Sequence, residues 1–140
     1  MRKRSDEALL AVARLMMDVS VRAAAELGGL SPVQLRALTV LSSASGANLA
    51  TLAEAMGITV STASRLVDRL VTAGWVQREP APHTRREVSL TLTDEGGNLL
   101  HRYDDRRLVE LHSHLAQLPG GRGDVVAAAL GELATTALQT

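Results

Sequence analysis

The sequence predicts a mainly α-helical fold with one small β-hairpin, and three observations lead to this prediction. Leucine and alanine, both strong helix formers, account for 44 of the 140 residues, while Trp75 and Tyr103 are the only aromatic residues. Apolar residues recur every three or four positions along most of the chain, as they do on one face of a helix. A single stretch, between Trp75 and Leu92, alternates between apolar and polar residues as strands do.

The composition excludes several classes of protein. The chain has the length of one domain, 46% apolar residues, and 15 basic against 15 acidic residues, which is unlike a disordered segment. Because cysteine is absent, there is no disulfide framework and no thiolate zinc site. The longest uncharged run, residues 37–53, contains serine, glycine, asparagine and threonine. We therefore expect a cytoplasmic protein with no cofactor, no metal site and no membrane partner.

Two helices are predicted in the first third of the chain. The apolar residues from Leu9 to Ala23 have helical spacing, so a helix is expected over residues 6–27, ended by two glycines at 28–29. Ser31, Pro32 and Gln34 then form the pattern of a capping box with proline at the first helical position. A second helix is expected from Pro32 to about residue 43.

The next segment has the pattern of a helix-turn-helix. A short helix is expected over residues 49–56, and Gly57 ends it. Thr59 is a suitable N-cap for a longer helix over residues 60–73, which Gly74 follows as the glycine after the C-cap. Two helices joined by a turn of three or four residues that contains glycine are typical of this motif.

After Gly74, a hairpin and two more helices are predicted. The strands are expected over residues 75–78 and 87–92, with the prolines confined to an extended connection over residues 79–86. Thr93 is a suitable cap for a helix that runs through residue 115, and the Pro-Gly-Gly sequence at 119–121 breaks it. A last helix is expected over residues 124–138.

The helix over residues 60–73 is the candidate recognition helix. In a helix-turn-helix, the second helix lies in the major groove and its N-terminal residues reach the base edges. The candidate contacts are its small hydroxyl side chains and its two arginines, namely Ser61, Thr62, Ser64, Arg65 and Arg69. The segment from Arg65 to Arg86 holds five arginines and two acids, a balance of +3 in a neutral chain.

Simpler interpretations stand beside this one. The serines and Thr62 could only cap and solvate the start of the helix, and Asp68 and Arg69 could form a structural pair. Each arginine could be a solvated surface charge. The sequence alone leaves these alternatives open.

Several segments together resemble the MarR family of bacterial transcriptional regulators. They are residues 57–70 (GITVSTASRLVDRL), Gly74-Trp75-Val76, Arg85-Arg86 and residues 92–96 (LTDEG). The resemblance implies a winged helix-turn-helix that binds duplex DNA as a homodimer, with the DNA-binding module at 31–93 and dimerisation helices at 1–30 and 94–140. It further implies a repressor that acts on a pseudo-palindromic operator and is released by a small-molecule ligand.

The wing departs from the family pattern at one position. In the family, the wing carries an Asp-x-Arg step whose arginine enters the minor groove while the aspartate braces it. Here the step reads Thr84-Arg85-Arg86, so Arg86 matches the inserting arginine and Thr84 replaces the carboxylate. A threonine can accept a hydrogen bond but cannot form an ion pair with a guanidinium group, so we expect a looser wing.

The resemblance also implies a cleft for a small aromatic or anionic ligand between the dimerisation helices and the DNA-binding module. Its candidate lining residues are Met16, Val19, Leu38, Leu41 and Trp75. The alternative is that this entirely apolar set belongs to the core.

Two other classes of function are alternatives to a DNA-binding regulator. No nucleophile with a base, paired carboxylates or glycine-rich phosphate loop is recognisable, so we predict no catalytic residues and no enzyme. A winged-helix module that serves protein assembly or ligand sensing, with weak or no DNA binding, is the alternative. Its support is Thr84 and the neutral net charge.

Overall fold

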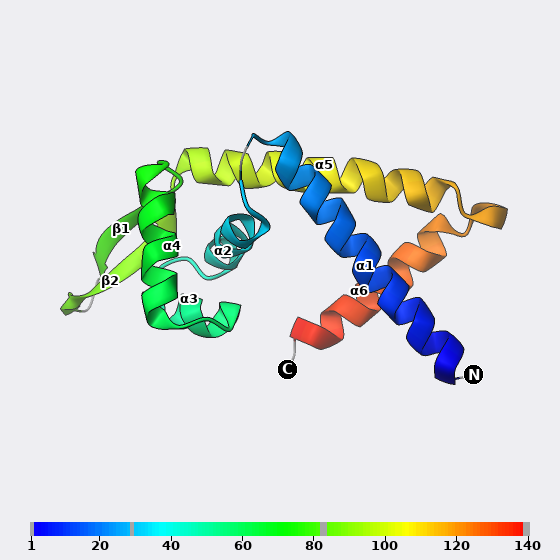
Figure 1. Ribbon diagram of the computed structural model, residues 1–140, viewed down its shortest axis with the longest axis horizontal. Helices are drawn as coiled ribbons and strands as arrows, with labels where there is room; N and C mark the ends of the chain where they lie inside the picture. Colours follow the sequence, from blue (N-terminus) through cyan, green and yellow to red (C-terminus); the bar gives the residue numbers. More distant parts are fainter. Residues whose placement is uncertain (1, 29, 82–83, 139–140) are drawn as a thin grey trace. The chain divides into compact units, whose positions relative to one another are not determined.

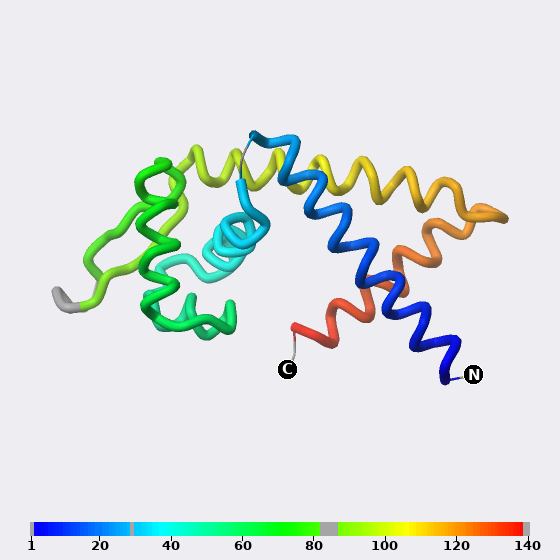
Figure 2. The backbone as a smooth tube through the Cα atoms, in the orientation of Figure 1, coloured from blue at the N-terminus to red at the C-terminus, as the bar shows by residue number. Residues whose placement is uncertain are grey.

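The computed structural model of the chain describes residues 2–28, 30–81 and 84–138, without the side chains of residues 84–86. Figures 1 and 2 trace its elements in chain order. They are α1 (Arg2–Glu26), α2 (Pro32–Ser43), α3 (Leu49–Met56), α4 (Val60–Thr72), β1 (Val76–Ala81), β2 (Thr84–Leu92), α5 (Asp94–Ala116), the 3-10 helix η1 (Pro119–Gly121) and α6 (Gly123–Leu138). The mainly α-helical fold with one hairpin is confirmed. The chain divides into two compact units, Met1–Asp104 and Asp105–Thr140.

The helix ends follow the capping signals in the sequence. The Gln34 N–H donates to Ser31 Oγ at 3.1 Å and the Ser31 N–H donates to Gln34 Oε1 at 3.0 Å, which is the predicted capping box of α2. Gly57 ends α3 with a φ of +66°, a left-handed conformation that side chains with a Cβ rarely adopt. Thr59 caps α4 by accepting from the Thr62 N–H at 3.2 Å. These local interactions fix where the helix-turn-helix elements begin and end.

The hairpin differs from the prediction. Its strands were expected to be short, with residues 79–86 as a loop, but β1 continues to Ala81 and β2 begins at Thr84. Pro80 therefore lies within a strand, opposite Val88. A two-stranded sheet consists of edge strands only, so a residue without an N–H is tolerated there. The register shifts between Pro80 and Ala81, just before the turn.

One hydrophobic core joins α2, α3, α4 and the hairpin in the first unit. Its fully buried side chains come from all of these elements, and include Leu38, Leu52, Leu70 and Leu90. The Leu90 N–H donates to the Ala47 carbonyl at 2.8 Å, which ties β2 to the loop before α3. The core thus holds α4 and the hairpin in a fixed relation.

Several helices keep large apolar side chains outside any core. In the first unit, α1 buries only Val19 and two alanines, and its exposed residues include Leu9, Leu10 and Met17. In the second unit, no described residue of α6 is buried, although the helix is largely apolar. None of the helices in the described ranges combines the length and apolar character that a bilayer crossing requires.

Candidate nucleic-acid interface

The recognition-helix candidate α4 has one buried and one exposed face. Ala63, Leu66, Val67 and Leu70 are buried in the core, because residues three and four apart share a face of a helix. The opposite side is polar, and its exposed residues are Ser61, Thr62, Arg65, Asp68, Arg69 and Thr72, with Ser64 half-buried at its border. The predicted candidates therefore lie on the surface of α4 that remains accessible.

The first turn of α4 uses two hydroxyl groups for capping. Besides accepting from the Thr62 backbone, Thr59 donates its hydroxyl proton to Thr62 Oγ1 at 2.9 Å. Thr62 Oγ1 is an acceptor in this bond, so its own hydrogen remains able to donate outward. Thr62 thus contributes to the cap and keeps one donor on the exposed surface.

Two arginines of α4 project without a carboxylate partner. Within the described part of the chain, the guanidinium groups of Arg65 and Arg69 form no ion pair, and both side chains are exposed. They are four residues apart, about one helical turn. Unpaired guanidinium groups suit phosphate oxygens or the O6 and N7 atoms of guanine.

Asp68 pairs with the hairpin. The Arg78 Nη2 group in β1 donates to Asp68 Oδ1 in α4. The two side chains are 36% and 58% exposed, so the pair adds at most about 1 kcal/mol to stability. Its main effect is to offset the negative charge of Asp68 on the exposed face of α4. Arg78 was not among the predicted site residues, although its position two residues after buried Val76 places it on the strand face that meets α4.

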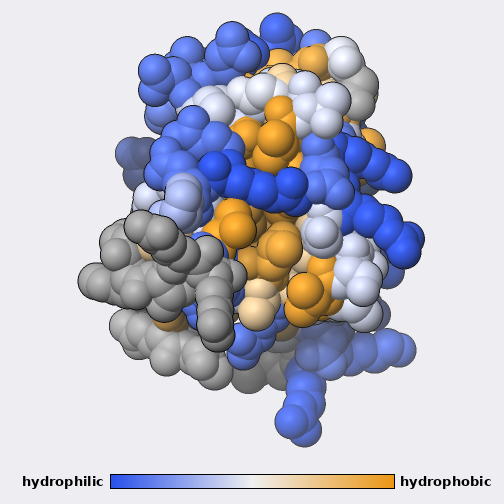
Figure 3. Space-filling model, turned by 90° about the vertical axis from the view of Figure 1, so that its left-hand side faces the viewer, coloured by the Kyte–Doolittle hydropathy of each residue, from blue (hydrophilic) through white to orange (hydrophobic). Residues whose placement is uncertain are grey.

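The wing candidates are only partly within the described structure. Thr84 begins β2 opposite Ala81, and the side chains of Thr84, Arg85 and Arg86 lie outside the described residues. Figure 3 views the end of the molecule that carries α4 and the hairpin, where hydrophilic side chains flank a strip of apolar ones. Val60 of α4 and Val88 of β2 are exposed apolar residues of these elements.

The start of α5 is locked to the turn after α4. Thr93 Oγ1 donates to the Gly74 carbonyl at 2.6 Å and accepts from the Gly96 N–H at 3.1 Å, which confirms Thr93 as the cap of α5. The Thr93 N–H donates to the Trp75 carbonyl at 3.0 Å. A Cβ on Gly96 would lie 2.1 Å from the Trp75 carbonyl oxygen, so only glycine permits this close approach.

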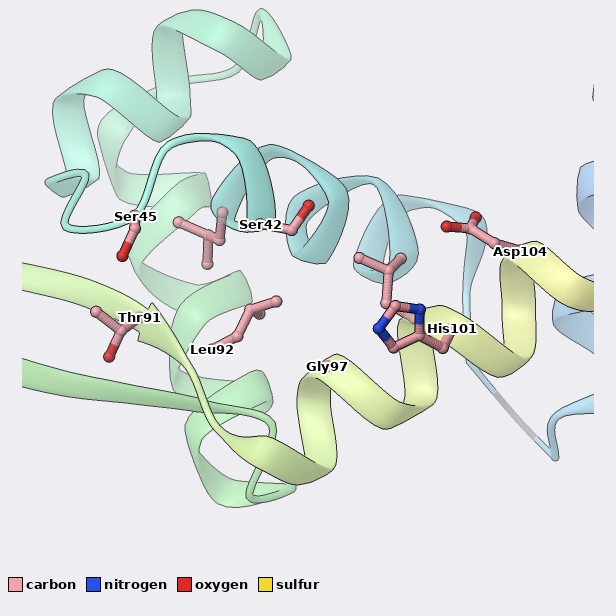
Figure 4. Close-up of a pocket in the computed structure, with 9 residues that line it drawn as sticks. Ser42, Ser45, Thr91, Leu92, Gly97, His101 and Asp104 are labelled. Carbon is pink, nitrogen blue, oxygen red and sulfur yellow. The ribbon is translucent and has the colours of Figure 1, made fainter.

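A surface pocket of about 410 Å³ lies between α2, the end of β2 and the start of α5 (Figure 4). Its polar lining includes Ser42, Ser45, His101 and Asp104. Thr91 also lines it, and Thr91 Oγ1 is buried without a hydrogen-bond partner in the described structure. The described residues contain no cluster of three side chains suited to a metal ion.

The predicted ligand-cleft residues mostly occupy the interior. Val19, Leu38 and Leu41 are almost completely buried, whereas Met16 and Trp75 are half-buried. Leu41 is the one of these five that lines the pocket, and none of the pocket's polar residues was predicted. The sequence could not indicate them, because the pocket forms where three elements distant in the sequence meet.

The middle part of the chain matches a family model. The model describes the MarR family and covers residues 28–87. The multiple antibiotic resistance protein MarR of Salmonella typhimurium is 29% identical over 66 residues, 47% of this chain and 46% of that protein. The transcriptional regulator PecS of Dickeya dadantii is 46% identical over 48 residues, 34% of this chain and 29% of that protein. These alignments span less than half of the relatives' length.

Solved structures match nearly the whole chain. RV1404 of Mycobacterium tuberculosis is 31% identical, with a TM-score of 0.81 over 93% of this chain and 90% of that one. The transcriptional repressor CouR, solved with a 23-mer DNA duplex, is 28% identical, with a TM-score of 0.70 over 93% and 89%. A MarR variant of E. coli has the same fold at 21% identity and a TM-score of 0.77, over 91% of this chain and 94% of that one. The chain belongs to the MarR family.

Proposed function

We propose that the protein is a transcriptional repressor that binds a specific duplex-DNA sequence as a homodimer in the cytoplasm. The observation that carries this proposal is the exposed face of α4, where Arg65 and Arg69 project without carboxylate partners. CouR, whose structure includes a DNA duplex, supports it through its likeness over 93% of the chain. Catalysis is no part of the proposal.

The proposed binding mode places α4 in the major groove and the hairpin along the adjacent backbone. Arg65 contacts a base edge, since it projects from the second turn of α4, and Arg69 contacts a phosphate. The hydroxyl groups of Ser61, Thr62 and Ser64 donate to phosphates near the helix N-terminus. At the wing, Arg86 enters the minor groove, whose negative potential attracts a guanidinium group.

The wing arginine gives a direct test of this mode. Arg86→Ala is expected to weaken operator binding by about 1–3 kcal/mol, because the minor-groove contact is lost. Thr84→Asp is expected to tighten binding, because it restores the carboxylate that braces the arginine in the family. Both dissociation constants can be measured by fluorescence anisotropy. An unchanged dissociation constant for Arg86→Ala would mean that Arg86 is a solvated surface charge and does not contact DNA.

A homodimer explains the apolar side chains that one chain leaves uncovered. We propose that residues 1–30 and 94–140 form the dimerisation helices, and that residues 31–93 form the DNA-binding module. Exposed apolar residues such as Leu9 in α1, Val109 in α5 and Leu133 in α6 would be buried by a second copy. Two-fold symmetry then predicts half-sites about 10 base pairs apart, or a multiple of that.

Leu133→Glu is expected to shift the protein from dimer to monomer. A carboxylate buried without a partner at an apolar interface costs several kcal/mol. Sedimentation velocity measures the shift directly. Val33→Glu, which changes a similarly exposed residue on α2 outside the proposed dimerisation helices, is the matched control and should leave the dimer intact. A Leu133→Glu protein that remains dimeric would contradict the proposed interface.

We propose that the pocket beside α5 binds the ligand that releases DNA. Its volume suits a small molecule, and Ser42, Ser45 and His101 supply hydrogen-bonding groups in its lining. The lining contains no phenyl, phenol or indole ring, and it contributes the His101 imidazole and the Asp104 carboxylate. The Asp104 carboxylate disfavours an anion, so these groups suit a neutral hydrogen-bonding ligand better than the small aromatic or anionic ligand that the family resemblance implies.

The proposed function is tested by titrating the protein against labelled duplexes from a randomised pool, at several salt concentrations. Tight binding to a palindromic subset, with affinity that falls steeply as salt rises, is expected because bound arginines release counterions from phosphates. Weak binding without sequence preference would favour the alternative, a winged-helix module used for protein assembly or ligand sensing.

A further inference from the structure

Val60 is an apolar residue whose side chain is not packed in the core. It is the first residue of α4, and 51% of its surface is exposed. It belongs neither to the buried core cluster nor to the partly buried residues packed against that cluster. Ala63, the next apolar residue of the helix, is by contrast completely buried. The packing of the described residues therefore gives no reason for a valine at position 60.

The surroundings of Val60 are those of a base-reading surface. It stands between the cap residue Thr59 and exposed Ser61, one turn or so before Arg65. The Thr59 hydroxyl group donates a hydrogen bond to Thr62 Oγ1, so part of the hydrogen-bonding capacity of this turn is already used in the cap. The two methyl groups of Val60 remain as the main apolar contact that this turn can offer a ligand.

The major groove presents one apolar feature, the C5-methyl group of thymine. Residues near the N-terminus of a recognition helix are those that reach base edges. An exposed aliphatic side chain there gains affinity only where it meets a methyl group and both lose their contact with water. Any other base would leave the Val60 methyl groups against polar edges.

We propose that Val60 is a specificity-determining residue that contacts the C5-methyl group of one thymine in each half-site. This inference rests on the proposed function, because it requires α4 to lie in the major groove. It adds a base identity to that function: the operator carries an A·T pair whose thymine faces the start of α4. The arginines supply most of the affinity, and Val60 adds discrimination at this position.

The test replaces single thymines of the selected operator by deoxyuridine, which removes only the methyl group. Dissociation constants are measured for the wild-type protein, Val60→Ala and Val60→Thr. Val33→Ala is the matched control, because Val33 is 54% exposed but lies on α2. For the wild type, one thymine in each half-site is expected to give about a fourfold loss on replacement, the effect of one methyl-sized group.

The pattern across variants decides the inference. At the sensitive position, Val60→Ala should bind thymine and uracil duplexes equally, and Val60→Thr, which keeps one methyl group, should retain part of the discrimination. Val33→Ala should reproduce the wild-type profile. Thermal unfolding should be unchanged in Val60→Ala, since the side chain packs against no core residue.

Three results would overturn the inference. A Val60→Ala profile identical to that of the wild type would assign the methyl contact to another residue. A uniform loss of affinity in Val60→Ala, without any sensitive thymine in the wild type, would give Val60 a positioning role only. A wild-type protein that binds no duplex would refute the proposed function itself, and the three results are distinguishable in one set of titrations.

Discussion

Arg65→Ala is expected to weaken binding of the selected operator by about 1–3 kcal/mol for each half-site. This is roughly a 5- to 150-fold factor in Kd per half-site, and the factor applies twice because both subunits of the proposed dimer carry the change. The structure gives the reason: the Arg65 guanidinium lies on the exposed face of α4 and has no carboxylate partner within the described residues. Its removal therefore disturbs no internal interaction, and the loss reports the contact with DNA. The Kd is measured by anisotropy at constant salt.

Two matched variants separate base reading from charge. Arg69→Ala also removes an unpaired guanidinium from α4, but as a phosphate contact it should weaken all sequences alike and lower the salt slope by about one for each subunit. Arg102→Ala removes an exposed arginine of α5 and should leave binding unchanged. Arg65→Ala should in addition relax the base preference at one position in each half-site. Retention of both affinity and preference would remove Arg65 from the interface.

The fold could be predicted where sequence-local interactions decide it. The bounds of α2 and α3 were predicted as observed, because a capping box and a left-handed glycine act within a few residues of the helix end. The hairpin strands were predicted too short. Pro80 suggested a loop, and its acceptance in β1 depends on β1 being an edge strand of the described sheet, which no local pattern reveals.

Some features of the candidate site could be predicted from local sequence patterns, and others could not. Helical periodicity placed Arg65 and Arg69 on the exposed face of α4, because α4 is strongly amphipathic. The pairing of Asp68 with Arg78, ten residues away, could not be predicted, and the neighbouring Arg69 had been considered as its partner. The exposure of Val60 could not be predicted either. A residue in the first turn of a helix has no preceding turn to cover it, so helical periodicity says little about its burial.

The Thr93–Gly96 junction shows how the fold supports the proposed function. Thr93 joins the turn after α4 to the first turn of α5 through two backbone carbonyls, and Gly96 allows the two segments to touch. In the proposed dimer, α5 carries dimerisation residues, so this junction links the recognition helix to the helix that meets the partner. A substitution at the junction should therefore mainly lower the free energy of unfolding. To a smaller extent it should also change the half-site spacing that the dimer prefers.

Gly96→Ala is expected to lower the free energy of unfolding by about 3 kcal/mol, the upper part of the usual range for overpacking. The added Cβ would stand 2.1 Å from the Trp75 carbonyl oxygen, a backbone atom that cannot rotate away. Urea denaturation followed by circular dichroism measures this loss at fixed protein concentration, since dimerisation contributes to stability.

Gly97→Ala is the matched control and should have the opposite sign. Gly97 lies in the same turn of α5, but a Cβ there would meet no atom within 4 Å. Alanine is favoured over glycine in a helix interior by about 1 kcal/mol, so this variant should be more stable than the wild type. The same substitution at adjacent positions thus separates helix propensity from packing. If Gly96→Ala were also stabilising, α5 and the turn after α4 could separate at little cost, and the junction could not hold the recognition helix in place.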